Sequence, residues 1–107
     1  MNEEIRGLID IDRTIHEPAR LMIVAVLSAV EEADFLYLLQ ATELTKGNLS
    51  AHLSRLEEAG YVDIEKMFVG KTPRTVARLT EAGARALEAY RLQLRGVVSG
   101  DTLSGAA

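Results

Sequence analysis

Side chains suited to specific polar recognition are concentrated between Thr45 and Ala59. Leu49, Leu53 and Leu56 recur there at i, i+4 and i+7, which predicts a helix with one apolar side facing the core. At about 100° per residue, the opposite side and the helix entrance hold small or hydrogen-bonding residues. These are Thr45, Lys46, Gly47, Asn48, Ser50, Ala51, Ser54 and Arg55. A helix face of small and hydrogen-bonding side chains can enter a groove of a partner molecule.

The sequence offers little for catalysis or metal binding. Ser50, His52 and Ser54 combine residue types found in catalytic triads, but residues two apart on a helix point away from each other. His16 is a conceivable metal ligand or base, yet the sequence has no cysteine and only one other histidine. No glycine-rich phosphate loop or isolated pair of acids is present. We therefore expect no enzyme, no metal site and no cofactor, and we interpret His16 as a cap or surface residue.

Length and composition limit the architecture. At 107 residues with 48% hydrophobic content, residues 1–107 fit a single domain with one modest core. The absence of cysteine excludes disulfides and cysteine nucleophiles. The acidic start lacks a signal core, and the longest apolar run, Leu21 to Leu27, is far shorter than the roughly 20 residues that cross a bilayer. We expect a cytoplasmic protein that does not enter membranes.

The net charge of −4 conceals an uneven distribution. Residues 1–43 hold nine acidic and three basic residues, whereas the remainder holds seven acidic and nine basic residues and has a net charge of +2. No acid occurs between Leu44 and Leu56 or between Lys66 and Thr80. Two local basic patches therefore exist in a chain whose average acidity would count against nucleic acid as a partner.

Two helices are expected before these patches. Residues 2–12 predict a short N-terminal helix that packs against the domain or against a second subunit. Its apolar residues at i, i+3 and i+4 are Ile5, Leu8 and Ile9. Pro18 suits a first helical position, and Ala19 to Val30 is apolar nearly all round, as expected of a central packing helix.

The next two helices are close together in sequence. Asp34 can cap a helix from Phe35 to Ala41, and Thr42 to Leu44 then form a tight turn. The hydroxyl of Thr45 can cap the polar helix, and Gly60 suits its left-handed end. Two helices joined by so short a turn match a helix-turn-helix in length.

A β-hairpin is expected next. Tyr61 to Phe68 alternates apolar and charged residues, Val69 to Pro73 favours a turn, and Thr75 to Leu79 alternates again. The tip, residues 68–74, carries polar side chains able to meet phosphate: Lys71, Thr72 and Arg74. The alternative interpretation is that these are ordinary solubilising charges of a loop.

The last predicted helix, 80–97, starts at a Thr80 cap and carries a narrow apolar stripe. The stripe consists of Leu87, Tyr90, Leu94 and Val97, spaced 3, 4 and 3 residues apart. In a chain this short, such a stripe favours pairing with another subunit. Together with the apolar residues of the N-terminal helix, it predicts a homodimer interface. Residues 99–107 are expected to form a flexible tail.

These elements predict an α+β, mainly α fold: a winged helix-turn-helix with a three-helix core, about 17–80, a β-hairpin wing and terminal dimerisation helices. Four segments carry a resemblance to known proteins: Glu17 to Leu21, Leu44 to Leu53, Leu56 to Val62 and Leu79 to Gly83. From Pro18 to about Tyr90 the sequence resembles the small winged helix-turn-helix transcription regulators of bacteria and archaea, of the MarR-like and ArsR-like kind.

The resemblance implies that the helix over 45–59 lies in the major groove of double-stranded DNA, that the hairpin touches the adjacent minor groove or backbone, and that the terminal helices form a homodimer. Arg55 and Asn48 are the expected base contacts, since arginine pairs well with guanine and asparagine with adenine. Lys71 is expected on the backbone. The cysteine-rich or histidine-rich sites of ArsR-like metal sensors have no counterpart in this sequence, and it carries no motif that identifies a small-molecule effector.

A winged helix can also serve as a protein-interaction module without DNA binding, and the overall acidity suits that alternative. An interaction module is expected to show an apolar or acidic recognition face. The predicted face instead carries Lys46, Asn48, Ser50 and Arg55. We therefore expect sequence-specific binding of double-stranded DNA by a dimeric transcriptional regulator.

Overall fold

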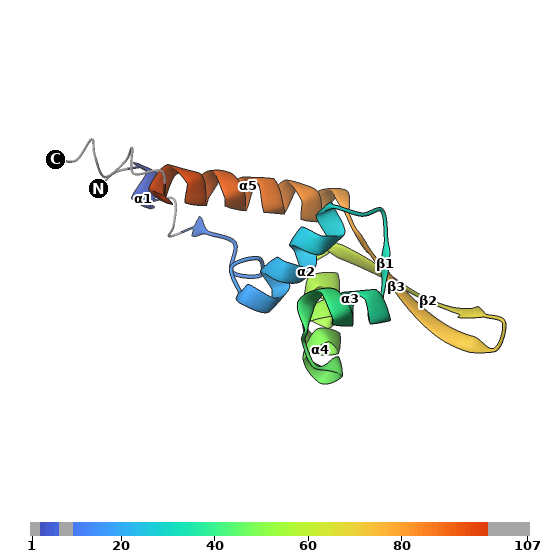
Figure 1. Ribbon diagram of the computed structural model, residues 1–107. Helices are drawn as coiled ribbons and strands as arrows, with labels where there is room; N and C mark the ends of the chain where they lie inside the picture. Colours follow the sequence, from blue (N-terminus) through green and yellow to red (C-terminus); the bar gives the residue numbers. More distant parts are fainter. Residues whose placement is uncertain (1–2, 7–9, 99–107) are drawn as a thin grey trace.

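The computed structural model describes residues 3–6 and 10–98, and Figure 1 shows how their helices and strands are arranged. In chain order the elements are α1 (Glu3–Arg6), α2 (Pro18–Ser28), β1 (Ala33–Asp34), α3 (Phe35–Thr42), α4 (Lys46–Glu58), β2 (Val62–Val69), β3 (Thr72–Leu79) and α5 (Glu81–Val98). The predicted fold class, a mainly helical winged helix, is confirmed. None of the helices in this part of the chain is both long and apolar enough to cross a membrane.

Helix α2 forms the centre of the core. Pro18 occupies its first turn, and the side chain of Glu17 accepts a hydrogen bond from the backbone N–H of Arg20 at 2.8 Å. Its buried residues pack between α3, α4, β3 and α5. Met22 is 40% exposed and Ala25 is also exposed, so this helix is less completely covered than its apolar sequence predicts.

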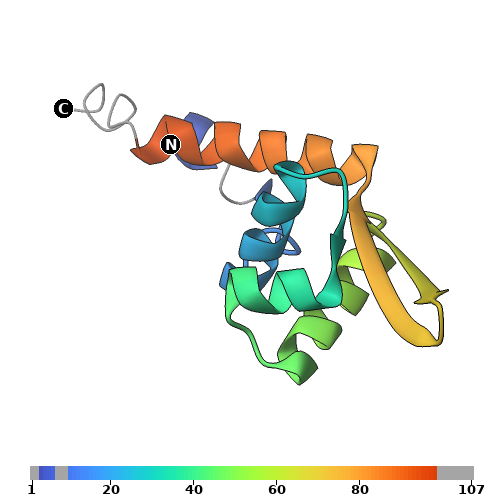
Figure 2. The same ribbon diagram turned by 45° about the vertical axis from the view of Figure 1, so that its right-hand side comes forward.

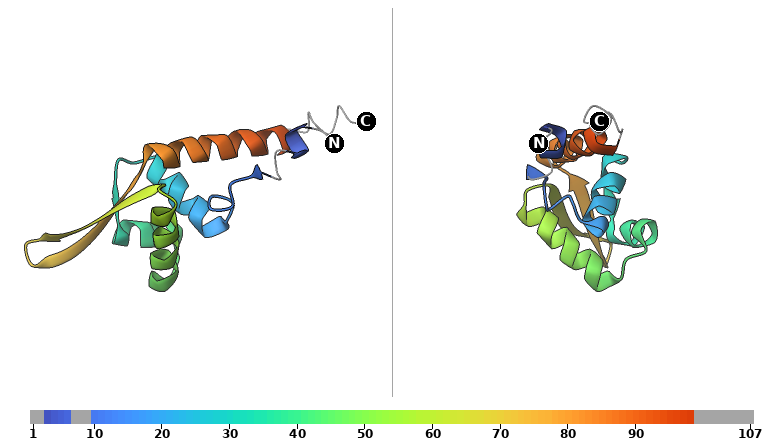
Figure 3. Two further views of the ribbon diagram at one scale, coloured as in Figure 1. Left: turned by 180° about the vertical axis from the view of Figure 1, so that it is seen from behind. Right: turned by 90° about the vertical axis from the view of Figure 1, so that its left-hand side faces the viewer.

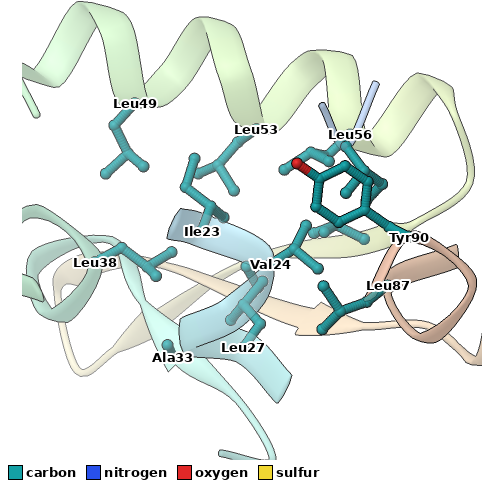
Figure 4. Close-up of a cluster of buried hydrophobic side chains, with 13 residues drawn as sticks. Ile23, Val24, Leu27, Ala33, Leu38, Leu49, Leu53, Leu56, Leu87 and Tyr90 are labelled. Atoms are coloured by element: carbon teal, nitrogen blue, oxygen red, sulfur yellow. The ribbon is translucent and has the colours of Figure 1, made fainter. Parts of the chain in front are cut away.

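The helix-turn-helix has its predicted caps. The carboxylate of Asp34 accepts from the N–H of Tyr37 at 2.8 Å, and the hydroxyl of Thr45 accepts from the N–H of Asn48 at 3.1 Å. Glu43, at φ 57°, gives the turn its left-handed residue. Three leucines of α4 are buried in the cluster drawn in Figure 4: Leu49, Leu53 and Leu56.

The wing is longer and its turn shorter than predicted. β2 and β3 pair from Val62 with Leu79 out to Val69 with Thr72, leaving a two-residue turn. Gly70 has a φ of +63° in this turn, which glycine adopts without strain because it lacks a Cβ. Pro73 therefore lies in β3 rather than in the turn. Strand β1 was not predicted. Its two residues pair with β3 and make the sheet three-stranded in the order β1-β3-β2.

Helix α5 begins as predicted, with the hydroxyl of Thr80 accepting from the N–H of Gly83 at 3.0 Å. Leu87 and Tyr90, which we predicted to face a partner, are instead 8% and 5% exposed and belong to the core of the single chain (Figure 4). The hydroxyl of Tyr90 also lies 2.9 Å from Nδ1 of His16. The core thus extends beyond the predicted range 17–80, because α5 lies directly across α2.

Of the predicted N-terminal helix, 2–12, the structure describes α1 and residues 10–12, and residues 11 and 12 are not helical, so the prediction extended too far. Residues 7–9 lie outside the described part of the chain. Leu8 and Ile9 fall there, as do the predicted tail 99–107 and the side chain of Val97. The two other predicted interface residues, Ile5 and Leu94, are described and partly exposed. α1 packs beside α5, near the end of α5 that extends past α2 (Figure 1).

Candidate nucleic-acid interface

The polar side of α4 is open to solvent. All the residues predicted to contact DNA from this helix are exposed: Thr45, Lys46, Gly47, Asn48, Ser50, Ala51, Ser54 and Arg55. α4 and the wing lie toward one side of the domain, and α5 lies across the opposite side, in each view of Figures 1 to 3. A duplex could therefore contact α4 and the wing together without meeting α5.

A cluster of polar side chains fixes α4 against α2. Arg20 donates from Nε to the carbonyl of Thr14 at 2.7 Å, and its Nη1 lies 3.2 Å from Nδ1 of His52. The same His52 nitrogen lies 3.7 Å from a carboxylate oxygen of Glu17. Partial burial raises the pKa of Glu17, but the N–H groups it accepts from and the nearby His52 and Arg20 outweigh this and lower the pKa below its usual value. His52 thus connects α4 to Glu17 and Arg20 at the start of α2.

Arginines from three segments of the chain lie around a hollow beside this cluster. Arg13, Arg20 and Arg55 line this hollow of about 440 Å³, and Glu58 lines it as well. Arg13 and Arg55 are exposed and have no ion-pair partner among the residues that the structure describes. Sequence reasoning did not select Arg13 or Arg20 because they lie in the acidic first part of the chain. Only folding brings them next to α4.

The two faces of the wing differ in their charges. The inner face of the wing is defined here as the face that carries Ile64, Lys66 and Thr75. These residues line a hollow of about 590 Å³ together with Ser50 and Ser54 of α4. Lys66 is exposed and makes no ion pair within the described residues. It belongs to the basic patch seen in the sequence, but it was omitted from the predicted contacts because alternation alone does not show which face meets α4.

On the opposite, outer face, the arginines are already paired. Arg78 contacts Glu32 at 2.8 Å and Glu65 at 3.1 Å, and the hydrogen bond to Glu65, with both carboxylate charges, raises the pKa of Arg78. Arg74 lies 3.5 Å from a carboxylate oxygen of Asp34. Arg74 lies in β3 rather than in the turn and forms this ion pair in the free chain, and its predicted contact with phosphate stays a prediction.

The remaining predicted tip residues are at or beside the turn. Lys71 is in the turn and Thr72 begins β3, and both are exposed. Lys71, like Lys46 on α4, has no ion-pair partner in the part of the chain that the structure describes. Uncompensated positive charge therefore occurs on α4, on the inner face of the wing and at its tip. The described residues include no group of three potential metal ligands.

The geometry defines a class of protein. A helix-turn-helix whose second helix presents an exposed polar face beside a β-hairpin is a winged-helix domain. The family profile described as "Winged helix DNA-binding domain" matches residues 19–98, and the chain belongs to this family.

Individual proteins are also similar to this chain. An uncharacterized protein of Methanocaldococcus jannaschii is 37% identical over 71 residues, which are 66% of this chain and 77% of that protein. The structure of the transcriptional regulator homologue protein from Pyrococcus horikoshii OT3 is similar with a TM-score of 0.82 at 30% identity, covering 92% of this chain and 96% of that one.

A MarR family transcriptional regulator from Streptomyces coelicolor, solved in complex with DNA, gives a TM-score of 0.64 at 22% identity, with coverage of 92% and 69%. At this identity the likeness concerns the fold alone. The predicted resemblance to MarR-like winged helices is confirmed at that level.

Proposed function

We propose that this protein is a transcriptional regulator that binds a specific sequence of double-stranded DNA as a homodimer. Helix α4 enters the major groove and the wing reaches the adjacent minor groove or backbone. The observation that carries the proposal is the position of the unpaired cations. In a chain of net charge −4, Lys46, Arg55, Lys66 and Lys71 are unpaired within the described residues and lie along α4 and the wing.

The exposed residues of this surface have different tasks. Arg55 and Asn48 project from α4 and are suited to base edges, because guanidinium and amide groups form bidentate hydrogen bonds with guanine and adenine. Lys46, Lys66 and Lys71 are suited to phosphates, which they bind without regard to sequence. Arg13, beside Arg55, extends the phosphate contacts to the α2 side of the helix.

The test compares Arg55→Ala with Lys71→Ala on DNA selected by the unmodified protein from a random duplex library. Arg55→Ala should cost about 1–3 kcal/mol on the selected sequence and relax its preference. Lys71→Ala should weaken all sequences alike and reduce the dependence of log K on log salt by about 0.9 for each bound subunit. Equal loss of preference in both variants would mean that the roles are wrongly assigned. Affinity of the unmodified protein that is indifferent to salt would favour a protein-interaction module.

The dimer is supported by the apolar surface that α5 leaves uncovered. Leu21, Ala25 and Leu94 line a shallow hollow of about 470 Å³ between α2 and α5. Ile5 of α1 lies near the same end of α5 and is partly exposed. A two-fold pairing of these surfaces would direct two α4 helices to successive major grooves, about 34 Å apart.

Leu94→Glu tests this assembly. The unmodified protein should sediment as a dimer at micromolar concentration, and Leu94→Glu should yield monomers that bind DNA more weakly while keeping the helical circular dichroism signal. The glutamate places a charge in the proposed interface at a residue that the core covers only in part. A monomer mass for the unmodified protein would contradict the dimer and leave α4 and the wing as a monomeric binding surface.

A further inference from the structure

The tip of the wing exposes two large apolar side chains. Phe68 is 72% exposed and Val69 is 58% exposed, and they directly precede the turn at Gly70 and Lys71. The wing projects beyond the helices in both the front and back views (Figures 1 and 3), and neither side chain belongs to the core. Packing within the chain therefore does not account for them. Because adjacent residues of a strand project from opposite faces, the two side chains are exposed on different faces of the wing.

Strand alternation assigns Phe68 to the inner face. Ile64, Lys66 and Phe68 alternate along β2, so their side chains project from the same side of the hairpin. Pro73 is the cross-strand partner of Phe68 and adds apolar surface beside it. Ile64 and Lys66 line the hollow next to α4. The inner face therefore carries Ile64 next to the core, then the unpaired Lys66, and finally Phe68 with Pro73 at the tip.

We propose that Phe68, supported by Pro73, is an apolar wedge that enters the minor groove of DNA. This inference rests on the proposed binding mode and adds a second means of recognition to it. Apolar side chains inserted from the minor groove partly unstack a base step and bend the duplex. The cost of that deformation depends on sequence and is lowest at flexible pyrimidine–purine steps. The wing would thus read deformability, while α4 reads base edges.

Charge and position favour DNA over a second copy of this chain as the occupant. Lys66 and Lys71 lie on either side of Phe68 in sequence, and the sequence has no acidic residue between Lys66 and Thr80. Two such tips would repel each other. DNA offers phosphates on both edges of the minor groove, where both lysines can bind while the ring lies between them. The inner face is also continuous with the exposed side of α4.

Fluorescence gives a direct test, because the chain contains no tryptophan and Phe68→Trp introduces a single reporter. The probe is the duplex selected from a random library by the unmodified protein, labelled with a dye so that anisotropy reports binding separately. Emission of Phe68→Trp should be quenched as binding proceeds, since the indole stacks on bases. Leu92→Trp, at a position 54% exposed on α5, is the control and should keep its emission.

The two readouts separate the possible failures. Binding by anisotropy with unchanged emission of Phe68→Trp would overturn the wedge and leave the proposed DNA binding intact. An absence of binding by the unmodified protein would overturn both.

A second measurement uses Phe68→Ala and Lys71→Ala. Phe68→Ala should weaken binding by about tenfold, the effect of losing a buried phenyl contact, without changing the salt dependence. Lys71→Ala should reduce the salt dependence. The phenyl ring is mostly exposed in the free protein, so the fold should be retained and circular dichroism should be unchanged. If Phe68→Ala leaves affinity unchanged and alters sedimentation of the DNA-free protein, the tip is a contact between copies and the wedge is wrong.

Discussion

The base and the tip of the wing are built for opposite purposes. At the base, Thr80 donates from its N–H to the carbonyl of Tyr61 at 3.0 Å and from its hydroxyl to the carbonyl of Gly60 at 2.6 Å. The hydroxyl of Tyr61 donates to the carboxylate of Asp12, which connects the N-terminal segment to the same point. At the tip, by contrast, the side chains of Phe68 and Val69 are mostly exposed and do not belong to the core.

This difference separates stability from recognition along one hairpin. Contacts at the base join the end of α4, the start of α5 and the segment before α2, so they set the angle at which the wing leaves the domain. The tip contributes surface without contributing to the core. Substitutions at the base should therefore change the free energy of unfolding, and substitutions toward the tip should change DNA binding only.

Gly83→Ala should have the largest effect on stability. A Cβ at this position would overlap the carbonyl oxygen of Tyr61 and lie 2.7 Å from Cδ1 of Leu79. The carbonyl belongs to the backbone at the base of the wing and cannot turn aside, so the strand and α5 must separate. We expect a loss of about 2–3 kcal/mol, seen as a fall of roughly 10 °C or more in melting temperature.

Gly47→Ala is the matched control for that substitution. It is also a helical glycine, but its Cβ would meet nothing within 4 Å. Alanine has the higher helix propensity, so the melting temperature should stay level or rise. A large loss in both variants would show that glycine itself, rather than the close approach to Tyr61, determines the result.

Tyr61→Phe should have the next largest effect, with a characteristic pH dependence. The hydrogen bond to Asp12, followed by burial and the carboxylate charge, raises the pKa of Tyr61 to about 12. Ionisation is thus harder in the folded than in the unfolded chain, where the pKa is about 10. The resulting stabilisation, about 2 kcal/mol, is fully present below pH 10 and is lost as the pH rises from 10 to 12.

The measurement is the free energy of unfolding of both proteins between pH 8 and 12. The difference between wild type and Tyr61→Phe should shrink across that interval, while lysines titrate alike in both and cancel. A difference that stays constant with pH would mean that the phenol does not keep its proton through the contact with Asp12.

Sequence patterns predicted the elements that local chemistry determines. Thr45, Asp34 and Thr80 cap their helices as expected, because an N-cap needs only a side chain and the next turn of backbone. The leucines of α4 are buried as their spacing requires. Where a pattern had two possible partners, the prediction was less secure: the stripe on α5 indicated an apolar contact, but two of its residues cover the chain's own core.

The site was predicted in part for the same reason. Exposure of the α4 face follows from helical periodicity within one segment. Other features depend on segments far apart in sequence. Arg74 forms an ion pair with Asp34, and Arg13 lies beside Arg55 in the fold. A basic residue can therefore be predicted from sequence as a DNA contact, but only the fold shows whether it already forms an ion pair with an acidic residue.

The smallest effects should come from single charges on the two faces of the wing, and they distinguish the inner face from the outer face most directly. Lys66→Ala removes an unpaired charge from the inner face, so it should reduce the salt dependence of DNA binding by about 0.9 per subunit and leave the melting temperature unchanged. Arg74→Ala removes a charge of the same sign only a short distance along the hairpin. Its partner Asp34 already caps α3, so this variant should lower stability by less than about 1 kcal/mol and leave the salt dependence as it is. Equal salt effects of the two variants would show that Arg74 exchanges Asp34 for phosphate when DNA binds, and that the ion pair on the outer face restrains the wing only in the free protein.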